Sequence, residues 1–576
     1  MNKVRLVFDK TVLVQELSGM IISESGAYCD KKLVFKNDYN RKKSIQEYQN
    51  IFNQKAFNFQ KNIELEAFHT TISRSVFVPL AKWISIIDIA MENNFINHSD
   101  VITIPISTKS PHICVLEAEG ESQGSFLYNS HYFLPFYVEK YLKIKGFNNI
   151  KVEVRKEVSY TVKRFLRGFA FIHLKFIQQL IYKLYNIVFI SNNQEINKSV
   201  IATRGIIQTH FSKNILSLFK KGDYTIVVNE SSIFPFRNLK YIKSLNTPFI
   251  YIEGNIPLRT TFNEYGKTLA HFLKYSLNRK KQMVSYLGLE IDVNRIITEV
   301  FIFKYYSETQ GLALKQTLKK SNNRKNIFCF DMLTPQPYYV KKHNKNHFTA
   351  QIQTTLMAGI KQENFVFTDK FFFTDIETYN SHNKINSDFN KKFDVLQDLK
   401  YASLFSKEKV SKVDTATFFT QPVFLNEEFE LIEFLKQYCA SRNIKLKLKL
   451  HPRSSKKDYN HFNIEYIDSN IDSITSISMS DLTLTRNSTI GLDSWKVNVP
   501  VLFFLSKSLT NDNISYIPDD YNGTFKELPS TQQLDDFMEN IDTLFYDFNF
   551  LKVDQPAIDA LSNKIEQLES NHEHQN

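Results

Sequence analysis

Alternation of hydrophobic and polar residues is clearest in the last third of the chain, where it predicts strands joined by helices. Lysine and leucine alternate strictly over 445–450, which predicts a strand that Pro452 ends. A second β-rich run, 482–485, stops at a polar turn, and hydrophobic residues then recur at helical spacing until Asn498. Together with a strand at 500–505, this order predicts a parallel α/β unit.

The same alternation of strand and helix begins earlier in the chain. Strand-like runs separated by helical patterns are found at 187–191, 224–229, 248–253 and 327–330, and a second series contains 416–422, a helix at 427–442 and a short strand at 465–467. Strands spaced by crossover helices pair in parallel. The chain is therefore expected to contain two α/β halves.

The length of 576 residues exceeds the size at which one hydrophobic core keeps growing, so more than one domain is expected. We expect a first α/β domain over 1–400 with a helical insertion at about 57–185, a second over 401–550, and a C-terminal helix and polar tail over 551–576. Further strands are predicted at 4–8, 32–35 and 100–106.

The longest helical pattern, 160–185, is both basic and rich in phenylalanine. Its hydrophobic side is predicted to contain Val162, Phe165, Leu166, Phe169, Phe176, Leu180 and Leu184, with Lys163, Arg164, Arg167, Lys175 and Lys183 interspersed. Such a helix can lie on an anionic membrane surface. It can equally be a core helix whose basic side chains extend to the surface.

Composition and charge narrow the class of protein. Hydrophobic residues make up 43% of the chain and aromatic residues 14%, which excludes a disordered chain. The formal net charge is +12, from 72 basic and 60 acidic residues spread along the length, and it fits an anionic partner. Nucleotide, phospholipid and nucleic acid all remain open on this evidence.

Cysteine usage and hydropathy indicate the compartment. The four cysteines form no CxxC pair, so neither a zinc module nor a disulfide framework is indicated. The N-terminal residues lack the pattern of a signal peptide, and no run reaches the roughly 18 apolar residues of a membrane span. A cytoplasmic protein, soluble or peripheral, is expected.

Candidate chemistry gathers after two of the predicted strands. His451 follows the strand 445–450, and Arg486, Asn487, Ser488 and Thr489 follow the strand 482–485. The carboxyl ends of strands in a doubly wound sheet meet at one edge, where ligands bind. Hydroxyls at the first turn of a helix suit a phosphate. The alternative is that His451 merely ends a strand and the hydroxyls merely cap a helix.

These motifs resemble those of GT-B glycosyltransferases of the bacterial capsule polysaccharide type, with β-Kdo transferases and sialyltransferases among them. The resemblance rests on His451-Pro452, on Ser488-Thr489, and on a segment over 251–262 followed by Tyr265-Gly266. It covers the second domain and about 60 residues of the first. It implies an α/β GT-B fold, with two Rossmann-like domains facing across a cleft and an extended N-terminal region.

The resemblance also implies an inverting, metal-independent transferase that uses a nucleotide sugar and no further cofactor. The donor is expected to be CMP-activated Kdo or sialic acid, and the acceptor an oligosaccharide or glycolipid of a growing capsule or lipopolysaccharide. We expect such a protein at the inner face of the bacterial inner membrane, where an anionic membrane surface is a further partner.

Residue roles follow from the same resemblance and from general acid–base chemistry. Glu253 is the expected catalytic base, with Glu230 as the alternative and His69 and Asp331 as weaker ones; Arg259 and Glu230 are expected on the acceptor side. His451 is expected to assist departure of the nucleotide. The donor nucleotide is expected to contact His451, Pro452, Arg453, Arg486, Asn487, Ser488, Thr489, Asp493 and Gln421.

Two other functions remain open at this level. A CDP-polyol phosphotransferase shares the donor motifs but forms a phosphodiester. A nucleic-acid-binding protein would account for the net charge, but no RNP, KH or helix-turn-helix signature accompanies that charge. We therefore expect no nucleic-acid partner.

Overall fold

The structure is a computed structural model of the chain. The described residues are 3–8, 19–23, 26–30, 32–36, 64–68, 72, 76–104, 133–152, 157–189, 196–204, 224–229, 248–277, 281–319, 321, 323–329, 335–352, 366–373, 379–380, 383, 391–395, 410–421, 425–451, 454–486, 488–505, 517 and 521–545.

The C-terminal sheet has six parallel strands in the order β18-β17-β16-β19-β20-β21. Counted along the chain this order is 3-2-1-4-5-6, which is the Rossmann order. The strands are β16 (Thr415–Phe419), β17 (Lys445–Lys449), β18 (Glu465–Tyr466), β19 (Leu482–Thr485), β20 (Val501–Phe504) and β21 (Thr524–Phe525). Its helices are α14 (Leu425–Ser441), α15 (Lys456–Tyr459), α16 (Ser473–Ser478), α17 (Ile490–Lys496) and α18 (Thr531–Glu539).

The central sheet repeats this order with one more strand. Its seven parallel strands run β15-β14-β13-β12-β7-β8-β9. Counted along the chain and read from β9, this order is 3-2-1-4-5-6-7, which is the Rossmann order with a seventh strand added. They are β7 (Ser199–Arg204), β8 (Tyr224–Asn229), β9 (Phe249–Tyr251), β12 (Asn326–Cys329), β13 (Phe348–Ile352), β14 (Lys370–Phe373) and β15 (Phe393–Val395). The predicted α/β class with two Rossmann-like sheets is confirmed.

A third sheet forms the extended N-terminal region that the sequence predicted. It is mixed, in the order β4-β3-β2-β1-β5-β6, with antiparallel pairing only at β2-β3 and β3-β4. Its strands are β1 (Lys3–Val7), β2 (Met20–Ser23), β3 (Gly26–Cys29), β4 (Lys32–Lys36), β5 (Val101–Ile104) and β6 (Ile150–Val152). Helices α4 (Val78–Glu92) and α6 (Phe133–Ile144) belong to this region. Strands β5 and β6 also lie within the segment 57–185, which therefore contains strands as well as helices.

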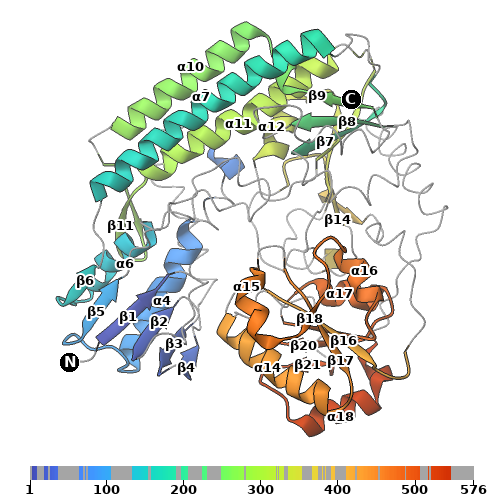
Figure 1. Cartoon of the computed structure of the whole chain (residues 1–576). Helices are drawn as coiled ribbons and strands as arrows, with labels where there is room; N and C mark the ends of the chain where they lie inside the picture. The colour runs from blue at the N-terminus through green and yellow to red at the C-terminus, as the bar shows by residue number, and fades with distance from the viewer. Residues whose placement is uncertain are drawn as a thin grey trace.

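Long helices run above the N-terminal and central sheets in the view of Figure 1. They are α7 (Glu157–Phe189), α10 (Leu258–Leu277) and α11 (Asn294–Leu318), with the shorter α12 (Gln336–His343) packed on α11. The first half of α11 contributes Ile296 and Phe301 to the core of the N-terminal sheet, and its last turns contribute Leu314 and Leu318 to the core of the central sheet. One helix therefore belongs to two cores.

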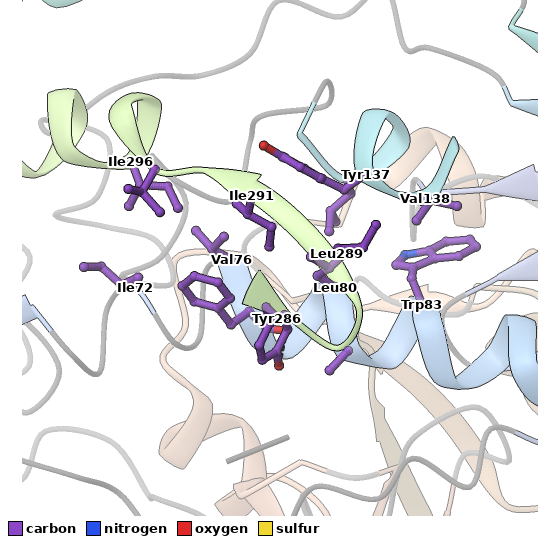
Figure 2. Close-up of a cluster of buried hydrophobic side chains, with 14 of the residues drawn as sticks. Ile72, Val76, Leu80, Trp83, Tyr137, Val138, Tyr286, Leu289, Ile291 and Ile296 are labelled. Carbon is purple, nitrogen blue, oxygen red and sulfur yellow. Dashed lines mark hydrogen bonds between the residues drawn. The ribbon is translucent and has the colours of Figure 1, made fainter. Parts of the chain in front are cut away.

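A β-hairpin closes the core of the N-terminal sheet. Strands β10 (Met283–Tyr286) and β11 (Leu289–Asp292) pair antiparallel, and Figure 2 shows the hairpin lying over α4 near α6. Its Tyr286 donates a hydrogen bond to the carbonyl of Phe77 at 3.1 Å, and the hydroxyl of Tyr137 on α6 accepts one from the N–H of Asp292 at 2.9 Å. Trp83 lies in this core and is fully buried.

Two predicted elements differ in the structure. The strand expected at 187–191 is absent over 187–189, because these residues form the last turn of α7, and residues 190–191 lie outside the described part. The strand expected at 248–253 ends at Tyr251, and Glu253 begins a short 3-10 helix, η5 (Glu253–Asn255). Both differences arise at β-branched or strand-like residues whose conformation is decided by packing on neighbouring elements.

Candidate functional site

The C-terminal sheet reverses its strand order between β16 and β19, which makes the carboxyl ends of these strands the expected ligand edge. Thr420 and Gln421 follow β16, and Arg486 and Ser488 follow β19. The end of β17 lies beside β16 and carries His451. The topology thus places the two predicted motifs at one edge.

A cavity of about 920 Å³ opens at this edge. Strand ends supply Phe419, Thr420, Lys449, Leu450 and His451, and the start of the α17 region supplies Ser488 and Ile490. The opposite wall comes from β18 and the loop after it, with Tyr466, Ile467, Asp468, Ser469, Ile471, Asp472 and Ser473. Ser454 and Lys456 complete the lining, so His451 and Ser488 share one cavity of the size that holds a small ligand.

His451 is held in place through its backbone. Its N–H donates to Oγ1 of Thr420 at 2.9 Å, and its carbonyl accepts from the N–H of Ser454 at 2.8 Å. The Thr420 hydroxyl also lies 3.4 Å from Oγ of Ser454. These contacts fix the turn after β17 against the end of β16, which fixes the direction in which the imidazole leaves the backbone.

The hydroxyl turn before α17 differs in detail from the expected helix cap. Thr489 occupies the N-cap position with helical torsions and makes no side-chain capping bond, while Oγ of Ser488 accepts from the N–H of Ile490 at 3.3 Å. Ser488 lines the cavity; among the described residues Thr489 is not part of the lining. Because α17 has only seven residues, its dipole adds little, and the hydroxyl and backbone N–H groups matter more.

Arg486 points toward α14. Its side chain is 1% exposed, with Nη1 at 3.4 Å from Oε2 of Glu428 and Nη2 at 3.5 Å from Oε2 of Glu427. Its charge is therefore shared with two carboxylates at the start of α14. A direct contact of Arg486 with donor phosphate stays a prediction.

Glu428 is the centre of a buried network behind the cavity. Its carboxylate is 0% exposed and accepts from the N–H of Gln421 at 2.7 Å and from the hydroxyl of Tyr459 at 2.6 Å. Burial raises the pKa of Glu428, and the Arg486 charge opposes part of that rise. The Tyr459 hydroxyl lies 3.5 Å from Oγ of Ser454, so the network reaches the turn that holds His451.

Lys449 fixes the opposite wall of the cavity. This buried side chain donates to the carbonyl of Asp468 at 2.6 Å and also to the carbonyl of Ile471. Burial lowers its pKa. Asp472 caps α16 by accepting from the N–H of Thr475 at 2.9 Å. The loop between β18 and α16 is thereby tied to the end of β17.

Sequence reasoning missed these supporting residues. The signal available for Glu428 was an acidic pair, Glu427-Glu428, in the first turn of the helix that follows the first strand, a position favoured by the helix dipole. No comparable signal marked Tyr459 or the role of Lys449. Their functions depend on contacts between residues that are distant in sequence.

The remaining predicted donor residues lie near the cavity or outside the described part. Asp493 is buried on α17, one turn after Thr489, and Gln421 is half-buried; among the described residues neither lines the cavity. Pro452, Arg453 and Asn487 lie outside the described residues.

On the expected acceptor side, Glu253 is 3% exposed at the start of η5. The neighbouring Gly254 packs directly on α7, where an added Cβ would come within 2.4 Å of the carbonyl of Tyr182. Arg259 is exposed in the first turn of α10. Glu230, His69 and Asp331 fall outside the described residues.

A metal cluster is not formed by the part of the chain that the structure describes, since no three His, Cys, Asp or Glu side chains gather as ligands there. The lining contains an imidazole, several hydroxyls and the exposed Lys456, together with the carboxylates of Asp468 and Asp472. Asp472 caps α16, and the ammonium of Lys449 is bound to the carbonyls of Asp468 and Ile471. The hydroxyls, the imidazole and the exposed Lys456 are groups that suit a phosphate-bearing molecule.

No protein-family model and no curated protein matches the sequence. Among solved structures, the UDP-GlcNAc 2-epimerase of Methanocaldococcus jannaschii is 12% identical with a TM-score of 0.40, covering 64% of this chain and 99% of that one. The wall teichoic acid polymerase TagF is 13% identical with a TM-score of 0.32, covering 71% and 93%.

An accessory secretory protein structure from Streptococcus pneumoniae is 10% identical with a TM-score of 0.33. The match covers 46% of this chain and 58% of the length of that protein, which is less than two thirds of it. Identities and scores this low carry no conclusion about the activity of the chain.

Proposed function

We propose that the chain is an inverting, metal-independent glycosyltransferase that takes its sugar from a nucleotide-linked donor. The observation that carries the proposal is the shared cavity of His451 and Ser488 at the switch point of a Rossmann-ordered sheet. Spacing in the sequence suggested this pairing, and the cavity is large enough for a nucleotide sugar.

The donor occupies the cavity in this proposal. Its phosphate lies against the Ser488 hydroxyl and the imidazole of His451, while Lys456 adds positive charge at the rim. These groups stabilise the negative charge that develops on the departing phosphate, and this lowers the barrier to glycosyl transfer.

The acceptor hydroxyl gives its proton to a base, for which Glu253 is the proposed group. The acceptor oxygen then bonds to the anomeric carbon as the bond from that carbon to the phosphate oxygen breaks, and the nucleotide leaves with the bonding electrons. One displacement inverts the anomeric configuration. Arg259 is proposed to bind an acidic acceptor.

The donor is proposed to be CMP-activated Kdo or sialic acid and the product a bacterial surface polysaccharide, capsule or lipopolysaccharide. This finer assignment rests on the resemblance of His451-Pro452 and Ser488-Thr489 to the cytidine-binding motifs of capsule enzymes. The same motifs occur with CDP-polyol donors, so the test must separate the two.

The test is a thermal-shift panel with CMP, CDP, UMP, UDP and GDP on the wild type and on His451→Ala. We expect a cytidine nucleotide to stabilise the wild type, by about 2.7 kcal/mol at a hundred times its Kd, and to have a much smaller effect on His451→Ala. His461→Ala is the matched control, because His461 is exposed in the same domain and outside the cavity.

Two outcomes would contradict the proposal: no nucleotide raises the melting temperature, or His451→Ala responds like the wild type. CMP release from a CMP-sugar supports the sugar donor, and a preference for CDP-glycerol replaces it with a polyol phosphotransferase. Salt-dependent binding to oligonucleotides without nucleotide stabilisation would favour a nucleic-acid-binding protein.

A further inference from the structure

Helices α7 and α10 lie side by side and antiparallel on one outer side of the molecule (Figure 1). Near one end the rings of Phe176 and Phe262 are 5.1 Å apart, and toward the other end Gly168 approaches the ring of Phe272 so closely that no Cβ would fit. The inner sides of both helices pack on α11. Their outer sides are therefore presented together.

The outer side of α7 carries hydrophobic residues that the core does not cover. Leu184 is 64% exposed and Val188 68%, and Leu166 and Ile177 are also exposed. Their spacings of 11, 7 and 4 residues place them on one stripe of the helix. The sequence reading placed Leu166 and Leu184 on one hydrophobic side with Phe165 and Phe176; in the structure the two leucines are exposed, whereas the two phenylalanines are partly buried.

A second stripe runs along α10. Leu258, Phe262 and Leu277 are exposed, with Phe262 at 56%, and the exposed small residues Gly266 and Ala270 continue the stripe between them. Eight of the twelve large hydrophobic side chains that are exposed in the described residues lie on these two helices. A concentration of this kind on a surface marks a binding site.

Positive charge flanks the hydrophobic stripe of α10. Arg259, Lys267 and Lys274 are exposed on this helix. The nearby acidic residue, Glu264, has a mostly buried side chain, and its Oε1 lies 2.9 Å from Nζ of Lys267. The exposed side of α10 is therefore both apolar and net positive.

We propose that this α7–α10 face, defined by Leu166, Ile177, Leu184, Val188, Leu258 and Phe262, docks on an anionic phospholipid bilayer. Apolar side chains next to basic ones are what binding in the headgroup region requires. No helix in the described ranges is long and apolar enough to cross a membrane, so the helices lie on the surface.

A second copy of the chain is a poorer occupant of the same face. A two-fold contact pairs each patch with itself, which would bring the basic residues of α10 near those of the other copy. An anionic surface neutralises these charges instead. The proposal does not depend on the transferase activity.

The test is flotation of the full chain with vesicles of phosphatidylglycerol and phosphatidylcholine, or of phosphatidylcholine alone. We expect the wild type to float with the anionic vesicles, and Leu184→Ser/Val188→Ser/Phe262→Ser to lose at least tenfold in the bound fraction at limiting lipid. The control Met479→Ser/Leu528→Ser removes exposed hydrophobic residues elsewhere and should float like the wild type.

A charge variant separates lipid binding from nonspecific adhesion. Lys267→Gln/Lys274→Gln should weaken binding to the anionic vesicles and reduce its sensitivity to salt, whereas Lys412→Gln, at a highly exposed site, should not. Circular dichroism and thermal melting establish that each variant is folded.

Failure of the wild type to float with anionic vesicles overturns the proposal, as does equal flotation of the wild type and the folded triple-serine variant. Dimerisation that the triple-serine variant abolishes, with no vesicle binding by the wild type, would assign the face to a second copy. That result also overturns the lipid assignment.

Discussion

Glu428 shows how a residue outside the lining of the cavity can set the geometry of that cavity. Its buried carboxylate receives Arg486, Tyr459 and the N–H of Gln421, which come from the ends of two strands and from the segment after β17. These partners meet at one carboxylate because the strands end together. Glu428 is thus a positioning residue for the turn that carries His451.

Replacing Glu428 by glutamine should destabilise the C-terminal sheet by about 3 kcal/mol, because it removes the closest charged partner of a buried guanidinium. It should also reduce stabilisation by nucleotide, since the turn after β17 loses its support. Urea unfolding and the thermal-shift assay measure the two effects.

The control for this change is Glu433→Gln on the exposed side of the same helix, which should alter stability by less than about 0.5 kcal/mol. If Glu428→Gln unfolds at the wild-type urea concentration, Glu428 does not organise the site.

At the residue scale, the sequence predicted part of the cavity lining. The shared cavity of His451 and Ser488 followed from their places after two strands, since strand ends meet at one edge. The carboxylates that face Arg486 could not be predicted, because Glu428 and Arg486 are 58 residues apart and come together only through sheet packing. The roles of Glu253 and Asp493 stay predictions.

At the scale of elements, strictly patterned strands were predicted well. The strand 224–229 agrees with β8, and the predicted 445–450 differs from β17 by one residue. The expected strand at 187–191 was wrong over 187–189, because α7 continues through the β-branched Ile187 and Val188 to Phe189 and leaves Ile187 and Val188 exposed. Residue type alone favours a strand there, and the continuing helix overrides that preference.

The contact between α11 and α12 contains a charge cluster with a testable pH dependence. Glu308 on α11 lies 3.0 Å from Nζ of Lys342, and 3.6 Å from both Nζ of Lys304 and Nε2 of His343. Burial by itself would raise the pKa of Glu308, but the contact with His343 and the charges of Lys304 and Lys342 outweigh it and lower the pKa to about 2.

A carboxylate with a lowered pKa stabilises the fold above its unfolded-state pKa, and the stabilisation is lost as the pH falls toward 2. Glu308→Gln should therefore reduce stability at pH 7 by on the order of 3 kcal/mol. The difference from the wild type should shrink between about pH 4.5 and pH 2.

Urea unfolding at a series of pH values measures this difference. Glu290→Gln, at an exposed position of β11, is the control and should follow the wild type throughout. A constant difference between Glu308→Gln and the wild type across this pH range would contradict the lowered pKa.

At the scale of the whole molecule, the chain carries one tryptophan in each of two separate cores. Trp83 lies in the core under the N-terminal sheet, and Trp495 packs with Phe503 and Tyr521 in the C-terminal sheet. The two core clusters share no residue. Each tryptophan is therefore a local fluorescent probe.

We expect Trp83→Phe and Trp495→Phe variants to give urea transitions with different midpoints, because each variant reports the core that retains its tryptophan. A nucleotide that binds at His451 should move the Trp495 transition and leave the Trp83 transition unchanged. Coincident transitions that the nucleotide moves equally would show a single cooperative unit instead.

Helix α11 links the N-terminal sheet to the central sheet and contributes no residue to the core cluster of Trp495. Its 25 residues form one continuous helix about 37 Å long, embedded at its start in the core of the N-terminal sheet and at its end in the core of the central sheet. Because both ends of the helix are packed in a core, the helix cannot rotate in one core without moving in the other. We therefore expect the N-terminal and central sheets to reorient together, as one rigid unit.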